Sequence, residues 1–201
     1  MGNMPNVIQR TVGGLNIVSQ ETMNFDKRFV NVQGEITQES AFEFALALQY
    51  LNSVSQNEVI TVLVNSPGGS IDAGLLMYDA IQTSPAPVRL VVLGAAYSMA
   101  AVIVASGLHG RYLLPNSKLM LHEPLLGYPI GGNTTSIKTI SDDLLATRDK
   151  INTILAKHTG KTKEEIEEAT KHDHYFTADE SVKFGLCDKV ITFGELVKEE
   201  Y

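Results

Sequence analysis

Short runs of β-branched and aliphatic residues recur along the chain and alternate with segments in which apolar residues follow the helical period. Each run is four to six residues long and is followed by turn or loop residues, a pattern typical of buried strands. These predicted strands span residues 29–33, 59–64, 88–93, 111–114 and 118–121. The predicted helices between them span about 40–55 and 70–82 and begin again near residue 98. Strands that alternate with helices predict an α/β domain around a largely buried sheet.

One long helix is predicted in the second half of the chain, from about Thr135 to His158. Its apolar residues follow helical spacing and are Ile137, Ile140, Leu144, Ile151, Ile154 and Leu155. At roughly 35 Å, such a helix is as long as a domain of this size is wide. It either projects and buries its apolar stripe against another copy, or packs across its own domain. A capping box of Thr162 and Glu165 predicts a further helix to about residue 171, and another is predicted at 178–184.

The domain organisation is simple. Residues 1–27 mix polar and apolar positions around Gly13 and Gly14, which predicts a flexible N-terminal arm. Residues 28–201 show no linker, repeat or low-complexity tract and are predicted to form a single domain. A chain of 201 residues can bury one sizeable core.

Composition and charge narrow the function classes. The net charge of −7, with scattered basic residues, disfavours binding to nucleic acid or to an anionic membrane. Cys187 is the single cysteine, so no internal disulfide forms, and we expect it to be a small core residue in a strand. Residues 1–15 lack a signal-peptide pattern, and the apolar stretch 95–105 is too short to span a bilayer. We therefore predict a soluble, cytoplasmic protein.

The strongest candidate for chemistry is Ser98. A strand ends, small residues form a tight turn, and Ser98 opens an apolar helix. The N–H groups and dipole at that helix start would stabilise an alkoxide or oxyanion. A plain N-cap serine is the commoner case, and the segment is not a G-x-S-x-G elbow, because Ala96 and Ala100 replace both glycines.

A second candidate is the glycine-containing turn after the strand at 59–64. Gly69 could donate one N–H to an oxyanion while Met99 donates another. Taken alone, the turn is an ordinary β-turn. A phosphate loop is disfavoured, because no Gly-Lys-Ser/Thr triplet follows, and the triplet at 160–162 lacks the required upstream glycine.

A general base and its partner are also available. His122 follows the strand at 118–121, where it can act near neutral pH. Asp173 can orient the imidazole of His122 by a hydrogen bond. A metal site built on His172, Asp173 and His174 lacks a third clear ligand. Spacing alone cannot bring Ser98, His122 and Asp173 together, since such triads are assembled in space.

These segments together resemble the ClpP family, the proteolytic subunits of Clp proteases. The resemblance covers nearly all of residues 5–192 and is carried by residues 64–69, 78–79, 96–101, 114–117, 120–124, 158–160 and 185–186. It implies the crotonase-like ClpP fold of repeated ββα units, with a protruding helix-strand handle at about 125–158. It also implies two stacked heptameric rings that enclose a chamber, fed by an ATP-driven AAA+ unfoldase of the ClpX, ClpA or ClpC type.

The resemblance implies a serine endopeptidase that degrades unfolded polypeptides. Ser98 would be the nucleophile, His122 the base and Asp173 the residue that orients it. Gly69 and Met99 would supply the oxyanion N–H groups. The extended substrate would pair with two segments, which consist of Ser70 and Ile71 and of Leu125, Leu126 and Gly127. No bound cofactor or metal is implied, and ATP is used by the partner.

Three departures from the family pattern leave alternatives open. Tyr97 is bulky beside the expected nucleophile, and Lys171 and His172 stand where many relatives carry an Asp-Arg pair that bridges the rings. We therefore keep a silent ClpP-like subunit of a mixed assembly as an alternative. Rings that associate differently, or with altered pH sensitivity, are a further hypothesis. An acyl-CoA enzyme of the crotonase type is a third class, which would need no Ser-His-Asp set.

Overall fold

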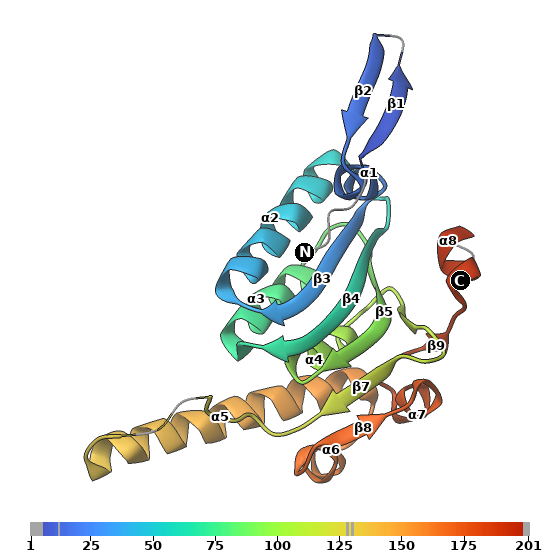
Figure 1. The fold of residues 1–201 in the computed structure, drawn as a ribbon. Helices are drawn as coiled ribbons and strands as arrows, with labels where there is room; N and C mark the ends of the chain where they lie inside the picture. Colours follow the sequence, from blue (N-terminus) through green and yellow to red (C-terminus); the bar gives the residue numbers. More distant parts are fainter. Residues whose placement is uncertain (1–5, 12, 128, 130, 199–201) are drawn as a thin grey trace.

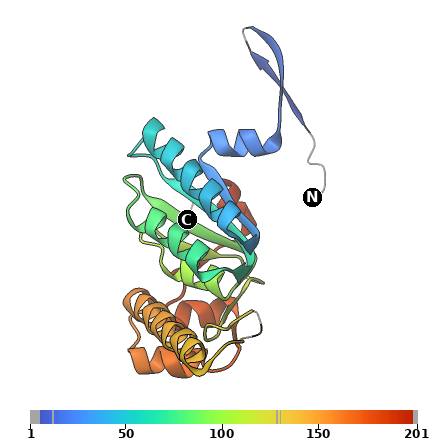
Figure 2. The ribbon, with the colours of Figure 1, turned by 90° about the vertical axis from the view of Figure 1, so that its left-hand side faces the viewer.

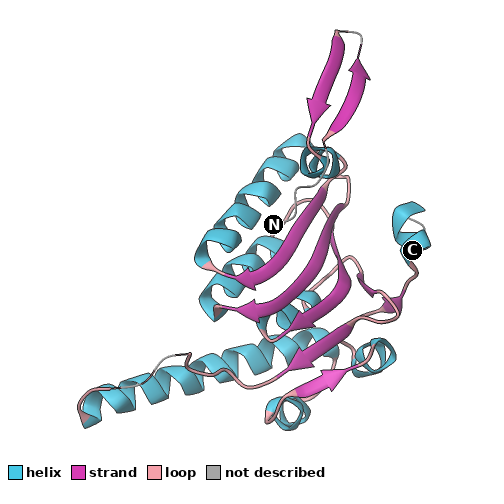
Figure 3. Ribbon diagram, viewed as in Figure 1, coloured by secondary structure: helices cyan, strands magenta, loops and turns pink. Residues whose placement is uncertain are grey.

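The computed structural model describes residues 6–11, 13–127, 129 and 131–198. Its centre is a seven-stranded sheet with the order β3-β4-β5-β6-β9, in which β7 also pairs with β5 and β8 pairs with β7 (Figures 1 and 3). The strands are β3 (Phe29–Ile36), β4 (Ile60–Gly69), β5 (Val88–Tyr97), β6 (Arg111–Leu113), β7 (Lys118–Leu121), β8 (His174–Phe176) and β9 (Lys189–Val190). Only β7 and β8 run antiparallel in this sheet. The predicted α/β class with a mainly parallel sheet is confirmed.

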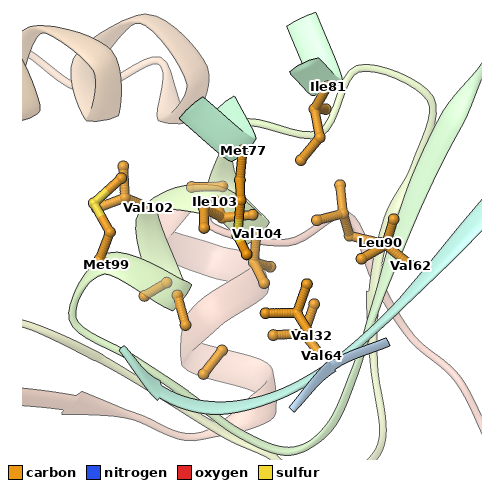
Figure 4. Packing of buried hydrophobic residues seen from close by; sticks show 14 of the residues in the cluster. Val32, Val62, Val64, Met77, Ile81, Leu90, Met99, Val102, Ile103 and Val104 are labelled. Carbon is orange, nitrogen blue, oxygen red and sulfur yellow. The ribbon is translucent and has the colours of Figure 1, made fainter. Parts of the chain in front are cut away.

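Three helices cover one face of the sheet and enclose the core. They are α2 (Gln38–Val54), α3 (Ile71–Gln82) and α4 (Met99–Ala105). Alternate residues of β4 and β5, such as Val62 and Leu90, point to these helices and are fully buried. They meet Met77 and Ile103 in one cluster (Figure 4). All seven residues of α4 are buried, which explains why its sequence is apolar on every side.

Strand β5 carries two partners end to end on the same edge. Its first half pairs with β6 and its second half with β7. Gly94 lies between the halves, and its N–H donates to the Ser117 hydroxyl at 3.0 Å. The same hydroxyl donates to the Val92 carbonyl at 3.0 Å. This arrangement brings the end of β7 beside the end of β5, where the candidate residues lie.

Much of helix α5 (Thr134–Thr159) projects from the domain (Figures 1 and 2), and that its apolar stripe is buried against another copy stays a prediction. Its buried residues are confined to the stretch from Ile151 to Leu155. Toward its N-terminus the apolar stripe is uncovered, and Ile137 is 45% exposed. Gly160, in the left-handed conformation at φ 72°, ends the helix.

Three capping boxes stand at the starts of the three helices in the C-terminal part of the chain. Thr162, Thr177 and Thr192 each accept a hydrogen bond from the backbone N–H of a glutamate three residues later. Each glutamate carboxylate accepts in return from the threonine N–H, which lowers the pKa of Glu165, Glu180 and Glu195. These boxes open α6 (Lys163–Thr170), α7 (Ala178–Phe184) and α8 (Phe193–Lys198).

The N-terminal stretch contains regular elements that were not predicted from the sequence. Its described residues form an antiparallel hairpin of β1 (Val7–Thr11) and β2 (Gly14–Val18), followed by α1 (Gln20–Asp26). The hairpin projects from the domain at the end opposite α5 (Figure 1). The first four residues of β2 are exposed, so this strand shows no alternating pattern of burial. That residues 1–27 form a flexible arm stays a prediction.

Several element boundaries also differ from the expectation. β4 and β5 continue through the expected turn and loop to Gly69 and Tyr97, because each pairs with a neighbouring strand there. β8 and α8 were not predicted. Cys187 precedes β9 instead of lying in a strand, although it is buried as expected. Among the described residues, no helix is long and apolar enough to cross a membrane.

Burial raises the pKa of the Cys187 thiol to about 12. The thiolate is the reactive form, so we expect Ellman's reagent to react with Cys187 on the order of a hundredfold more slowly in the folded protein at pH 8 than in guanidinium. The folded-state pKa lies above the unfolded value of 9.0, so this burial stabilises the fold fully below that value and loses its effect as pH rises toward 12. Equal rates in both states would contradict this prediction.

Candidate active site

Ser98 lies at the turn between β5 and α4, in a backbone conformation that is rare for a side-chain-bearing residue. Its φ is 54° and its ψ is −126°, and Arg28 is the only other described non-glycine residue with positive φ. Such a conformation costs about 1–3 kcal/mol and persists where surrounding contacts impose it. The Ser98 N–H donates to the Met120 carbonyl at 2.8 Å, which fixes the turn to β7. Ser98 occupies the N-cap of α4, yet its side chain makes no capping hydrogen bond.

The Ser98 hydroxyl instead meets His122. The Oγ of Ser98 and the Nε2 of His122 are 2.7 Å apart and share a hydrogen bond. The Nδ1 of His122 lies 3.2 Å from the Oδ1 of Asp173. The structure therefore joins the hydroxyl, the imidazole and the carboxylate in one hydrogen-bonded chain. The catalytic roles of the three residues stay predictions.

The strand register explains why these three residues converge. β7 and β8 are antiparallel, and Leu121 pairs with His174. One residue beyond this pair, His122 and Asp173 face each other. β5 runs parallel to β7 with Tyr97 opposite Met120, so Ser98 emerges beside the end of β7. Positions far apart in the chain thus meet where the strands end.

The two glycines at the end of β4 close against the Ser98 turn. A Cβ on Gly68, whose φ is 92°, would lie 2.6 Å from the Tyr97 carbonyl oxygen and 2.8 Å from the Ser98 Cβ. The Gly68 N–H donates to the Ser66 hydroxyl at 3.1 Å. Gly69 pairs with Ile36 of β3, and a Cβ added to Gly69 would lie 2.3 Å from the Ile36 carbonyl oxygen. No side chain fits at either position, so both must be glycine.

The first turn of α4 faces the same region. Its hydrogen bonds begin with the Ala101 N–H, which donates to the Ser98 carbonyl at 2.9 Å. The N–H groups of Met99 and Ala100 precede that bond and have no carbonyl partner within the helix. Met99 therefore stays a candidate for an oxyanion donor, and Gly69 at the end of β4 stays the second predicted donor.

A small apolar hollow lies beside Ser98 and His122. Its walls come from four parts of the chain and are Ile71, Met99, Val102, Leu121, Pro124, Ile151 and Leu155. Ile71 was predicted to contact the substrate. That residues of α5 form part of the wall was not predicted. Helical periodicity identified Ile151 and Leu155 as buried, but not what they pack against. The hollow is too small for a whole side chain as it stands.

The remaining predicted residues lie around this hollow. Ser70 caps α3, its hydroxyl accepting from the Ala73 N–H at 3.3 Å. Leu125, Leu126 and Gly127 follow His122 in a segment without regular structure, and Leu125 is exposed. The segment is anchored by Glu123, whose carboxylate accepts from Arg148 of α5 at 3.4 Å. That contact links the projecting helix to the residues next to His122.

The alternative of a metal centre at 172–174 has no support in the geometry. Asp173 faces His122, while the His174 ring stacks on Phe176 at a centroid distance of 4.1 Å. Within the described part of the chain, no group of three or more His, Cys, Asp or Glu side chains could hold a metal ion.

Comparisons with known proteins agree on one family. The family model described as Clp protease matches residues 14–193. A curated protein of Leuconostoc citreum (strain KM20) is 35% identical over 189 residues, which cover 94% of each chain. That protein is named ATP-dependent Clp protease proteolytic subunit.

Gly68→Ala tests whether the glycine turn positions Ser98. The new Cβ would collide with the Tyr97 carbonyl oxygen and the Ser98 Cβ, and a displacement of about 1 Å commonly costs a hundredfold in rate. We expect the rate of Ser98 labelling by a fluorophosphonate to fall about a hundredfold. Gly131→Ala is the matched control, because nothing lies within 4 Å of its Cβ. Labelling of the Gly68 variant at the control rate would refute the positioning role.

Proposed function

Since the chain belongs to the Clp protease family, we propose that it is a proteolytic subunit that hydrolyses peptide bonds of unfolded proteins through Ser98. A single observation carries the assignment of residues: Ser98, His122 and Asp173 form one hydrogen-bonded chain at the end of the sheet. An acyl-CoA enzyme would not need this chain of three groups. A silent subunit would keep them without reactivity, and a serine probe distinguishes that case.

The reaction begins at the Ser98 hydroxyl, which donates its hydrogen bond to the Nε2 of His122. As Oγ attacks the peptide carbonyl, His122 takes the proton and then gives it to the leaving amine. Water, activated by the same nitrogen, hydrolyses the acyl-enzyme. Asp173 accepts from the Nδ1–H of His122, which holds the imidazole in the tautomer that leaves Nε2 free to accept.

The tetrahedral intermediates place negative charge on the former carbonyl oxygen. We assign its stabilisation to the backbone N–H groups of Met99 and Gly69. Loss of one such donor typically costs about 3–4 kcal/mol in the transition state. The rigidity of the glycine turn and of the buried helix α4 favours this assignment, because donors that are already in place need no reorganisation.

An extended polypeptide would lie between two segments that flank Ser98. We assign one side of the substrate to Ser70 and Ile71 and the other to Leu125, Leu126 and Gly127. Backbone pairing with both would bind substrates with little regard to sequence, since main-chain groups are common to all of them. The small apolar hollow lined by Ile71, Val102 and Leu155 would present an apolar surface to the substrate beside Ser98. The chemistry uses this chain's own groups and water, and ATP is consumed by the partner.

We further propose that the chain assembles into two stacked heptameric rings, onto which an AAA+ unfoldase docks. Two apolar stripes support assembly. One occupies every fourth position on the outside of α2 and consists of Phe42, Leu46, Tyr50 and Val54, all exposed. The other is the uncovered stripe of the projecting part of α5. A cytoplasmic location, and altered ring contacts at Lys171 and His172, stay predictions.

Ser98→Ala is the direct test of the nucleophile. Removal of a triad nucleophile costs on the order of a millionfold in kcat, so hydrolysis of a short fluorogenic peptide should fall to background. Wild-type protein should carry one fluorophosphonate adduct per chain, on Ser98. Activity within about tenfold of wild type in the variant would disprove the assignment. An unlabelled but assembled wild-type protein would favour the silent subunit.

Ile137→Asp tests the role of α5 in assembly. Ile137 lies on the exposed apolar stripe, and a charge there would oppose contact between copies. We expect sedimentation to show two-ring particles for wild type and single rings for the variant. Thr139→Asp adds the same charge to the opposite face of the helix and should leave the two-ring particle intact. Identical sedimentation of all three proteins would argue against an α5 interface.

A further inference from the structure

Three residues with large side chains form a row across the sheet beside the candidate active site. Tyr97 at the end of β5 pairs with Met120 of β7, and Met120 pairs with Tyr175 of β8. The row therefore crosses the three strands that carry the reactive residues. Met120 is nearly buried in the middle, while Tyr175 is 54% exposed.

The two tyrosine rings contact each other. Their centroids are 5.7 Å apart and their planes meet at 83°, which is the favourable edge-to-face geometry. Met120 is the registered partner of both tyrosines, so the ring contact spans its strand. The contact directly joins β5 to β8, two strands that share no backbone pairing.

The row of Tyr97, Met120 and Tyr175 lies next to the hydrogen-bonded chain of Ser98, His122 and Asp173. Ser98 follows Tyr97 directly. His122 lies two residues after Met120, and Asp173 lies two residues before Tyr175. Because side chains alternate along a strand, we expect His122 and Asp173 to lie on the same face of the sheet as Met120 and Tyr175. A shift of β8 relative to β5 would therefore move Asp173 relative to Ser98 and His122.

Asp173 depends on β8 for its position. Its side chain is 59% exposed, and its one hydrogen bond within the described chain is to His122. β8 has three residues and pairs with β7 alone. On one face of β8, Phe176 is buried and packs on Phe184 at 4.9 Å. On the other face of β8, the ring of Tyr175 contacts the ring of Tyr97, and this contact holds β8 as the contact between Phe176 and Phe184 does on the first face.

We propose that Tyr97 and Tyr175 are positioning residues that hold β8 in register with β5 and thereby keep Asp173 aligned with His122. The proposal rests on the proposed roles of Ser98, His122 and Asp173. Neither ring is assigned a contact with the substrate or with the reacting atoms. The bulk of Tyr97 beside Ser98, which the sequence left without a role, is explained by this contact.

Tyr97→Ala and Tyr175→Ala test the proposal by kinetics on a short fluorogenic peptide. An edge-to-face pair is worth about a two- to tenfold change in an equilibrium constant, so we expect kcat to fall about two- to tenfold with KM within twofold. The double variant should be no worse than either single one. Tyr97→Phe keeps the ring and should restore kcat. In an Asp173→Asn background, Tyr97→Ala should have no further effect, because the contact acts through that carboxylate.

Hydrogen exchange provides a readout that does not need activity. Tyr97→Ala should speed amide exchange across residues 174–176 and leave β4 unchanged, in protein whose assembly and unfolding temperature match wild type. Tyr175→Ala, at the more exposed ring, gives the same readout if Tyr97→Ala fails to fold. Unchanged exchange in β8, a rise in KM at constant kcat, or an equal loss in Tyr97→Phe would overturn the proposal. Failure of Ser98 to label would sink the proposed function, while the exchange result would still decide whether the rings hold β8.

Discussion

The backbone turn at Ser98 is the constraint on which the site depends. A serine at φ 54° is unfavourable by itself, so contacts on both sides must hold it. Met120 of β7 accepts its N–H, and Gly68 of β4 closes against its other side. The fully buried helix α4 fixes the direction in which the chain leaves. Because the turn removes Ser98 from an ordinary capping role, its hydroxyl is available to His122.

The same sheet that holds the turn also aligns the remaining groups. β5 accommodates β6 and β7 end to end, which places the end of β7 next to Ser98. β8 then adds Asp173 opposite His122. The alignment weakens with distance from the core, because α4 is buried whereas β8 is short and half exposed. The contact between Tyr97 and Tyr175 strengthens the arrangement at its weakest strand.

Much of this could be predicted from the sequence, for identifiable reasons. The strands that begin at Ile60 and Val88 are runs of β-branched and aliphatic residues, whereas the strand at Phe29 alternates and α5 follows helical spacing. The predicted α/β class was correct. The chemistry-bearing residues Ser98, His122 and Asp173 were identifiable by type and position. Spacing alone did not predict their convergence, which the family resemblance implied, because the convergence follows from strand register. β8 was missed, although β6 is equally short and was predicted. The ends of β4 and β5 were misjudged because strand pairing overrides their turn-forming glycines.

The central claim is that Ser98 is a nucleophile served by His122 and held ready by Asp173. A crystal structure of the protein after reaction with a peptidyl phosphonate tests it most directly. The account predicts a covalent bond from phosphorus to the Ser98 Oγ, a phosphoryl oxygen within hydrogen-bond distance of the Met99 and Gly69 N–H groups, and His122 still bonded to Asp173. An adduct on another residue, or an intact adduct with His122 and Asp173 apart from it, would contradict the account.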